Sequence, residues 1–379
     1  MGHLKKILWG LACLLCLVGC FVLWRGDRKT VETLTPQLSA ARWETEEKPY
    51  AMASVFLEPV EAIAGHDIGA IYLRVENALT AAGVPSDRYP WFYAASYETE
   101  ATLGCGASHT DVLLTAVDGE FFRMHPLPLR SGWYIHPDDL MHDRIVLDRK
   151  AAWDLFYSDN VAGQYVELSG VTLQVAAVVD IEPGALNELA AGDTRRAWVL
   201  SDCPALGDGE PRYTCLEMVM PQPVKQFATG TLRAALGDAL DESTPVMDNS
   251  ARFSLPNRWK ILRSLRLRGI QDTAIAYPYW ENAARLAENR LARRLLPEGV
   301  LLLIPALSLL GLLLWLNHRR TWGLHSIRDA LENAVDRKRQ RDYDARLRGQ
   351  EPKTLRGFVP NRNRREKAAR YANRTKFRK

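Results

Sequence analysis

The sequence lacks the short motifs that mark the common classes of enzyme. It has no G-x-x-x-x-G-K-[ST] phosphate-binding loop, so it cannot hydrolyse ATP by the mechanism that this loop supports. It also has no G-x-S-x-G nucleophile turn and no H-E-x-x-H metal-binding helix. Ser108 beside His109 is no catalytic pair, because triads assemble across a fold. We therefore expect a chain without enzyme activity and without a cofactor.

Net charge is small over the whole chain but unevenly distributed. The 379 residues contain 49 Lys and Arg against 45 Asp and Glu, a net charge of +4. Residues 317–379 contain 20 Lys and Arg against 7 Asp and Glu, so the rest of the chain carries −9. A mildly acidic body and a strongly basic tail predict that the two parts face different environments.

Long apolar runs occur only twice, and each contains 18 residues, Ile7–Trp24 and Gly299–Leu316. That length is the short end of what spans a hydrocarbon core of roughly 30 Å. Trp24 and Trp315 lie near run ends, where interfacial anchors are typical. We predict two transmembrane helices. An alternative for the first run is a lipoprotein signal with a lipid on Cys20, although the run continues beyond that residue to Trp24.

The distribution of basic residues predicts the membrane topology. Lys5, Lys6 and the basic tail favour a cytoplasmic location for both ends, which leaves residues 25–298 outside, although three basic residues after Trp24 argue the other way. The predicted parts are a cytoplasmic N-terminus (1–6), transmembrane helix 1 (7–24), a linker (25–49), an extracytoplasmic core domain (50–255), membrane-proximal helices (256–298), transmembrane helix 2 (299–316) and a basic cytoplasmic tail (317–379).

Cysteine is scarce outside the first run. Cys203 and Cys215 flank a polar loop and could form a disulfide if the compartment is oxidising. Two small buried thiols are the alternative, and we leave both open. Cys105 has no obvious partner and is expected to be buried.

Hydrophobic periodicity in the outer region predicts strands and helices that mix without strict alternation. Helical spacing over 67–82 and 149–156 contrasts with branched and aromatic strands such as 51–58 and 144–148. This mixture predicts an α+β fold. Ser169 and Gly170 predict a hairpin turn between two alternating strands. Further helices are expected at 224–240, 256–268 and 278–296, the last leading directly into the second apolar run. The candidate packing positions on that last helix are Trp280, Ala284, Leu291 and Leu295.

Three phrases in the outer region occur in a recognisable order. They are "AVDGEFFRMHPLPLRSGWYI", "DRIVLDRKAAWDLF" and "VAGQYVELSGVTLQVAAVVD". The first resembles a V-x-x-x-F-F…P-L-x-x-G phrase of the MacB-like periplasmic core domain, the outer part of MacB/FtsX-type ABC transporter permeases. The resemblance covers roughly residues 50–202 and rests on these matches among others: Phe121, Phe122, Pro128, Gly132, Gly163 and Gly170.

We interpret these matches as a structural motif. Phe121 and Phe122 are expected to bury their rings, each contributing about 1.5–3 kcal/mol if enclosed. Pro128 limits the chain to an extended path, and the glycines permit backbone geometries closed to other residues.

The resemblance implies a non-catalytic membrane subunit or accessory of an ABC-type export or signalling complex, in which the outer domain transmits conformational change or binds partners. Family permeases usually carry four spans, whereas this chain has two and is truncated relative to the family. A separate ABC-type ATPase, a multi-span permease subunit, or both are therefore the implied partners. A homo-oligomer is also possible.

The segment His136–His142 is the best metal candidate, since His136, Asp138 and His142 could gather around zinc. It supports the alternative function, a membrane-anchored extracytoplasmic metal-dependent enzyme. A solvated helix start with Asp138 or Asp139 near its N-terminus is the competing interpretation, and we assign no metal.

The basic tail ends in "NRNRREKAARYANRTKFRK". Nucleic-acid binding is one interpretation of Arg and Lys mixed with aromatic residues. Because the tail follows a predicted span, attraction to anionic lipid and enforcement of topology are favoured, and we expect no nucleic-acid partner.

Overall fold

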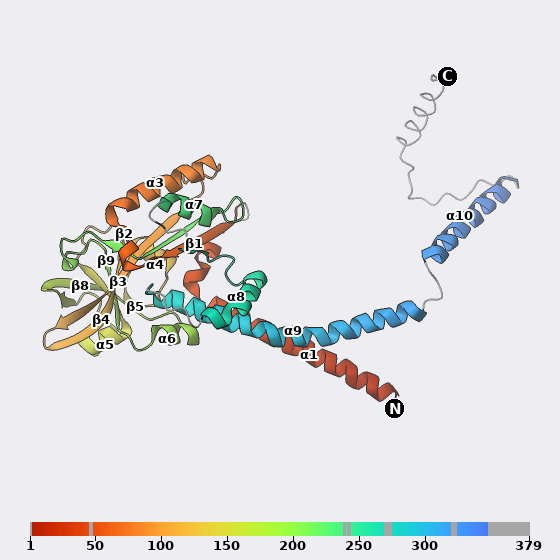
Figure 1. Ribbon diagram of the computed structural model, residues 1–379, viewed down its shortest axis with the longest axis horizontal. Helices are drawn as coiled ribbons and strands as arrows, with labels where there is room; N and C mark the ends of the chain where they lie inside the picture. Colours follow the sequence, from red (N-terminus) through yellow and green to blue (C-terminus); the bar gives the residue numbers. More distant parts are fainter. Residues whose placement is uncertain are drawn as a thin grey trace, which may run out of the picture. The chain divides into compact units, whose positions relative to one another are not determined.

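The computed structural model describes residues 2–44, 48–237, 240, 244–268, 275–319 and 324–347. The chain forms two units, residues 1–306 and 307–379, and each is described by itself. The first unit contains the sheet, its covering helices and most of the two apolar helices (Figure 1). The second contains the end of α9 and the polar helix α10 (Leu324–Leu347). The basic end of the tail, 361–379, lies outside the described residues.

A mixed β-sheet forms the body of the first unit. Its order is β12-β1-β11-β3-β4-β9-β6-β8-β5, and β7 pairs with β3 and β8. The pairs β4–β9 and β6–β8 are parallel and the other pairs are antiparallel, which confirms the α+β class. The strands are β1 (Tyr50–Phe56), β3 (Phe92–Cys105), β4 (Ser108–Gly119), β5 (Leu129–Gly132), β6 (Arg144–Asp148), β7 (Tyr165–Leu168), β8 (Val171–Val179), β9 (Arg196–Leu200), β11 (Cys215–Pro221) and β12 (Val246–Asp248). A separate small sheet pairs β2 (Ile63–Ala64) with β10 (Arg212–Tyr213).

Helices cover both faces of the large sheet (Figure 1). One face is covered by α3 (Gly65–Ala81) and α7 (Phe227–Leu236) over the β1 half and by α5 (Arg149–Phe156) over the β8 half. The other face packs against α2 (Ser39–Trp43), α4 (Phe121–Met124) and the start of α9 (Tyr279–Arg319). The remaining elements are η2 (Pro59–Glu61), α6 (Ala185–Ala191), η3 (Pro204–Leu206) and α8 (Leu255–Arg268). Since β1 alternates between the two cores, all of its residues are buried.

Local turn chemistry explains where several predicted elements begin and end. Ser169 and Gly170 both have positive φ, 51° and 80°, and join β7 to β8 as a hairpin. The helix predicted over 224–240 is shorter in the structure, Phe227–Leu236. Gln226 takes a left-handed conformation before it and Gly237 ends it at φ 54°, so the predicted bounds were wrong.

The predicted linker, 25–49, is folded over most of its length, and this expectation was wrong. Helix α1 (Gly2–Glu32) continues well beyond the apolar run, followed by η1 (Thr35–Leu38) and α2. Leu34 and Ser39 are buried although the surrounding sequence is polar. Polar side chains hold this segment through hydrogen bonds to other parts of the molecule, as in Arg42 donating to the carbonyl of Met124. Its sequence therefore shows no apolar periodicity that would reveal the fold.

Two helices are long and apolar enough to cross a membrane, His3–Glu32 and Tyr279–His318. Their most apolar windows are unburied, unlike the core helix of a soluble protein. Helix α9 is continuous over 41 residues although it contains Pro297 and Pro305, so the sheet-packing segment and the second apolar run form one helix.

Candidate functional site

A buried arginine holds α9 to the rest of the first unit. The Arg252 side chain is 2% exposed, and its two Nη atoms bind the carboxylate of Glu281 at 2.6 Å each. Its Nε donates to Glu288 Oε1 at 2.8 Å, and Nη1 donates to Gln37 Oε1 at 3.2 Å. Because the two glutamates are seven residues apart, they lie on one face of the helix, two turns from each other. One side chain therefore fixes the rotation of α9 and its position along the axis.

The carboxylate partners of Arg252 stabilise its charged form. Burial acts against the charged guanidinium, but the carboxylates of Glu281 and Glu288 outweigh burial and raise the pKa of Arg252. The bidentate geometry matches the planar guanidinium to the carboxylate. Removing one member of such a buried group would leave uncompensated charge, so the arrangement specifies one position of the helix.

A second charged group joins three helices next to the two apolar runs. Arg258 of α8 donates through Nη2 to Asp27 Oδ2 at 2.6 Å and to the Leu291 carbonyl at 2.8 Å. Arg294 of α9 binds Asp27 Oδ1 at 2.6 Å, and Glu298 lies 3.3 Å from Arg258. The contacts link α1, α8 and α9, and we call the set formed by these residues and the Arg252 group the helix junction.

The first turn of α9 is seated on the sheet by aromatic and polar contacts. The hydroxyl of Tyr279 donates to Glu182 Oε2 at 2.9 Å, and the Arg196 guanidinium lies over the Tyr279 ring, 4.8 Å from its centroid. Burial raises the pKa of Glu182. Trp280 lies against Phe121, with ring centroids 5.7 Å apart. The start of α9 is therefore part of the core.

The predicted motif residues Phe121 and Phe122 lie at this contact. They form α4 and are 2% and 7% exposed, as the sequence predicted. Phe121 also stacks on His125 with centroids 4.5 Å apart, and the His125 Nε2 lies 2.6 Å from Glu217 Oε2 in the core. The double aromatic motif thus supports both the sheet and the docking of α9.

The other motif positions have local structural roles. Gly132, at φ 75°, lies so close to the Ala176 carbonyl that a Cβ would overlap it. Gly163, at φ 89°, donates its N–H to the Val175 carbonyl at 2.7 Å, and Gly170 completes the β7–β8 turn. Pro128 is exposed, and its carbonyl accepts from the N–H of Asp180. The motif therefore shapes the β5–β8 edge without forming a binding site.

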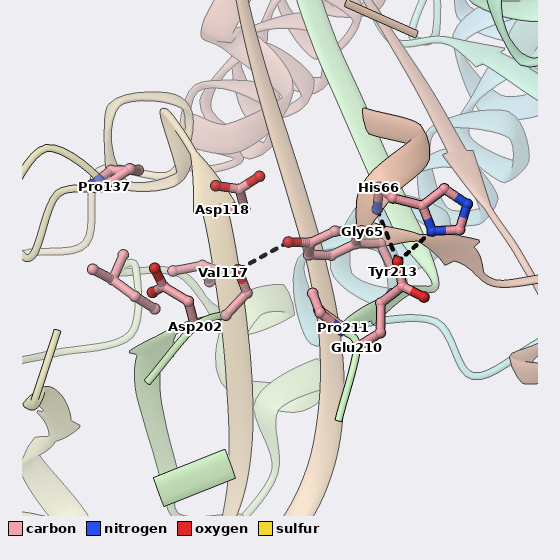
Figure 2. A pocket seen from close by; sticks show the side chains of 11 residues that line it. Gly65, His66, Val117, Asp118, Pro137, Asp202, Glu210, Pro211 and Tyr213 are labelled. Atoms are coloured by element: carbon pink, nitrogen blue, oxygen red, sulfur yellow. Dashed lines mark hydrogen bonds and ion pairs between the residues drawn. The ribbon is translucent and has the colours of Figure 1, made fainter. Parts of the chain in front are cut away.

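A polar hollow of about 280 Å³ lies beside the ends of β4 and β9 (Figure 2). Its lining includes His66, Asp118, Asp202, Glu210 and Tyr213. The Tyr213 hydroxyl bonds to Ser201 Oγ at 2.8 Å. His66 binds Glu210 through its ring and its backbone N–H, and that hydrogen bond raises the pKa of the exposed imidazole. The acidic side chains come from three different segments, and this hollow contains no assembled nucleophile and base.

The metal candidates are held by other groups. No helix begins at His136–Asp139, since the backbone forms a turn, and His136 Nδ1 accepts from the Asp138 N–H. Both ring nitrogens of His142 are engaged, Nδ1 with Asp202 Oδ2 at 2.6 Å and Nε2 with the Asp139 carbonyl at 2.7 Å. Within the described ranges, no three His, Cys, Asp or Glu side chains are arranged to hold a metal ion.

Cys203 and Cys215 are free, buried thiols in the structure. They pack in different apolar clusters, on opposite faces of the sheet. Burial raises the pKa of each thiol, which lowers its reactivity. Cys105 is half-buried rather than fully buried.

Sequence reasoning identified part of the junction and missed its charges. Of the proposed packing positions on α9, Trp280, Ala284 and Leu291 are buried, whereas Leu295 is only half-buried. The missed residues are the buried charged ones, Asp27, Arg252, Arg258, Glu281 and Glu288. A usable signal was present, because Glu281 and Glu288 share the helical face of those apolar positions.

Comparison with known proteins finds one family model and several solved structures that are similar to part of this chain. Residues 48–208 match the family model of the MacB-like periplasmic core domain. The extracellular domain of the noncanonic ABC-type transporter YknZ from Gram-positive bacteria is 16% identical, with a TM-score of 0.38, and the match covers 52% of this chain and 99% of that one. The periplasmic region of MacB from Actinobacillus actinomycetemcomitans is 14% identical, with a TM-score of 0.38, covering 53% and 89%. Among curated proteins, none matches the sequence significantly.

The family match begins just before β1 and ends after η3, so it contains the motif around Phe121 and Phe122 and the strands β3 to β9. Apolar helices stand before and after it. This chain therefore carries a MacB-like periplasmic core domain, of the kind found in ABC transporter permeases, between two candidate transmembrane helices.

Proposed function

We propose that this protein is a non-catalytic membrane subunit or accessory of an ABC-type export or signalling complex, and that its outer domain transmits conformational change or binds partners. The observation that carries the proposal is the continuity of α9, which joins the core of the domain to the second apolar run. This helix begins in the core against Phe121 and continues through the helix junction into the second apolar run without interruption.

A rigid connection is what transmission of motion requires. The Arg252 group fixes the rotation of α9, and Tyr279 and Trp280 fix its first turn. A movement of the apolar run would therefore reach the sheet as a shift of Trp280 and Tyr279, rather than being absorbed in a linker. Because α1 shares the junction through Asp27, the two apolar helices would move together where they join the domain.

The proposed topology places both termini in the cytoplasm and residues 25–298 outside, with the core domain at 50–255 and the basic tail from 317. The excess of Lys and Arg after the second run supports it. Labelling intact cells with a membrane-impermeant maleimide should modify Gly209→Cys above the background of the parent chain. Asp336→Cys should react only after permeabilisation, and labelling of this site in intact cells would overturn the topology.

Because the sequence has no phosphate-binding loop, a separate ABC-type ATPase, a multi-span permease subunit, or both would complete the complex. The basic tail would contact that partner or anionic lipid at the inner surface. Tagged protein from gently solubilised membranes should recover an ABC-type ATPase, and deletion of residues 321–379 should weaken recovery. Isolation of the chain alone, under conditions that preserve other complexes, would contradict the proposal.

Coupling is tested separately from association. Inserting Gly-Gly between Leu296 and Pro297 should leave the ATPase bound but change the hydrolysis rate of the recovered complex, because the helix no longer transmits its rotation. The matched control places the same two glycines after the exposed Gly209. Equal hydrolysis rates for both insertions would argue against transmission through α9.

A further inference from the structure

The helix junction also sets the level at which the domain meets the membrane. Asp27 lies three residues after Trp24, the end of the first apolar run, and Glu298 directly precedes Gly299, the start of the second. Arg258 of α8 binds both acidic residues. Helix α8 is therefore held at the point where both apolar runs begin or end on the domain side.

The two apolar helices lie side by side and antiparallel at this level. A Cβ on Gly26 would lie 3.2 Å from Arg294 Nη1, and a Cβ on Gly19 would lie 3.4 Å from Leu301 Cδ1. Residue numbers rise on one helix as they fall on the other. Trp24 and the start of the second run therefore lie at nearly the same position along the axis of the helix pair. The boundary of the hydrocarbon layer is thus defined by both helices.

Exposed basic side chains surround this level on all three helices. We call Arg25, Lys29, Lys260, Arg263, Arg290 and Arg293 the basic collar, and each is exposed. In contrast, the acidic Asp27 and Glu298 face inward to Arg258 and Arg294. Arg263 also lies over the ring of Trp259, 5.2 Å from its centroid, and that tryptophan is itself half exposed.

The heights fit a lipid headgroup layer. With a rise of about 1.5 Å per residue, Lys29 stands about 8 Å, Arg293 about 9 Å and Arg290, the farthest on these two helices, about 14 Å beyond the ends of the apolar runs. The headgroup region is about 5–8 Å thick on each side of a bilayer, and long basic side chains extend several ångströms along a helix toward it. An exposed tryptophan beside arginine is typical of the same layer.

We propose that the basic collar binds the phosphate groups of anionic phospholipids in the leaflet next to the domain, and so fixes the height and tilt of the helix junction on the membrane. The proposal rests on the two apolar runs crossing a membrane, which is part of the proposed function. It assigns a role to the basic residues after Trp24, which the positive-inside bias alone does not explain.

The test uses the full chain in a neutral detergent and follows thermal unfolding with added phosphatidylglycerol, phosphatidylcholine or inorganic phosphate. Phosphatidylglycerol should raise the Tm by at least about 3 °C more than phosphatidylcholine, and inorganic phosphate should not. The variant K260Q/R263Q/R290Q/R293Q should lose this difference. It keeps the basic tail as well as Arg25 and Lys29, so the comparison with the parent chain reports the four collar residues of α8 and α9.

Two controls keep the result interpretable. The variant R130Q/R149Q/K150Q/K225Q removes the same number of exposed charges from the outer domain and should keep the full lipid effect. The variant R263K/R290K/R293K retains the charges and should also keep it, even if the glutamine variant has a lower Tm without lipid. Equal effects of both lipids on the parent chain, a full effect in the glutamine variant, or the same stabilisation by inorganic phosphate would overturn the proposal. Recovery of an ATPase with the tagged chain does not depend on any of these outcomes.

Discussion

The helix junction and the segment His136–His142 are both rich in charged residues, yet they differ in burial. In the junction, Arg252 and its carboxylate partners are at most 4% exposed. In the other segment, Asp138 is 93% exposed and Asp202, the partner of His142, is 61% exposed. Buried charges interact strongly because little water screens them, whereas exposed pairs contribute little. The charged residues of His136–His142, which stand out in the sequence, therefore interact more weakly than the buried charges of the helix junction.

Substitutions in the helix junction should lower the free energy of unfolding more than any other change considered below. Arg252→Met removes the buried guanidinium that binds both Glu281 and Glu288, and we expect a loss of about 3–5 kcal/mol in the free energy of unfolding. Denaturant unfolding of the full chain in a neutral detergent measures it. Adding Glu281→Gln and Glu288→Gln to this variant removes the two carboxylates that Arg252 binds and should recover part of the loss. A single variant as stable as the parent would show that the Arg252 group does not fix α9.

Removing the aromatic contact between α4 and α9 should cause the second-largest loss of stability. Phe121→Ala removes a ring that packs on both His125 and Trp280, and we expect a loss of about 3 kcal/mol. Trp153→Ala is the matched control, because that side chain is 56% exposed and its loss should cost much less. Unchanged melting of Phe121→Ala would remove the core-anchor interpretation of the motif.

A buried carboxyl group should make stability depend on pH. Burial raises the pKa of Asp148 to about 6, above its usual value, so the folded state binds a proton more tightly than the unfolded state. Its contribution to stability therefore increases as the pH falls from 7 to 5, by about 1 kcal/mol, and is lost as the pH rises through 6. Asp148→Asn keeps an N-cap for α5 and should abolish this part of the pH dependence. The same pH slope in both proteins would contradict the assignment.

The exposed segment should give the smallest effect. His142→Ala breaks its ion pair with Asp202, and we expect the free energy of unfolding to change by less than about 1 kcal/mol. The same denaturant measurement applies, with the parent chain as reference. Loss of stability as large as that of Arg252→Met would show that the segment is a structural centre, contrary to its exposure.

Local patterns in the sequence were sufficient for much of the fold. The Phe121–Phe122 motif, the Ser169–Gly170 turn and the helix after Pro278 all follow from short-range signals, since turn glycines and helical spacing act within a few residues. The folded segment after Trp24 could not be predicted in the same way. Its polar side chains are buried by partners distant in the sequence, as in Gln37 with Arg252.

The sequence by itself determined the two apolar helices, the α+β class and the core-domain motif, because each depends on composition or spacing within one segment. Only the tertiary structure decided which charges matter. Arg252 is 29 residues from Glu281, and Arg258 is 231 residues from Asp27. Charges so far apart in the chain come together only when the sheet and its helices have packed, and burial then makes their interactions strong.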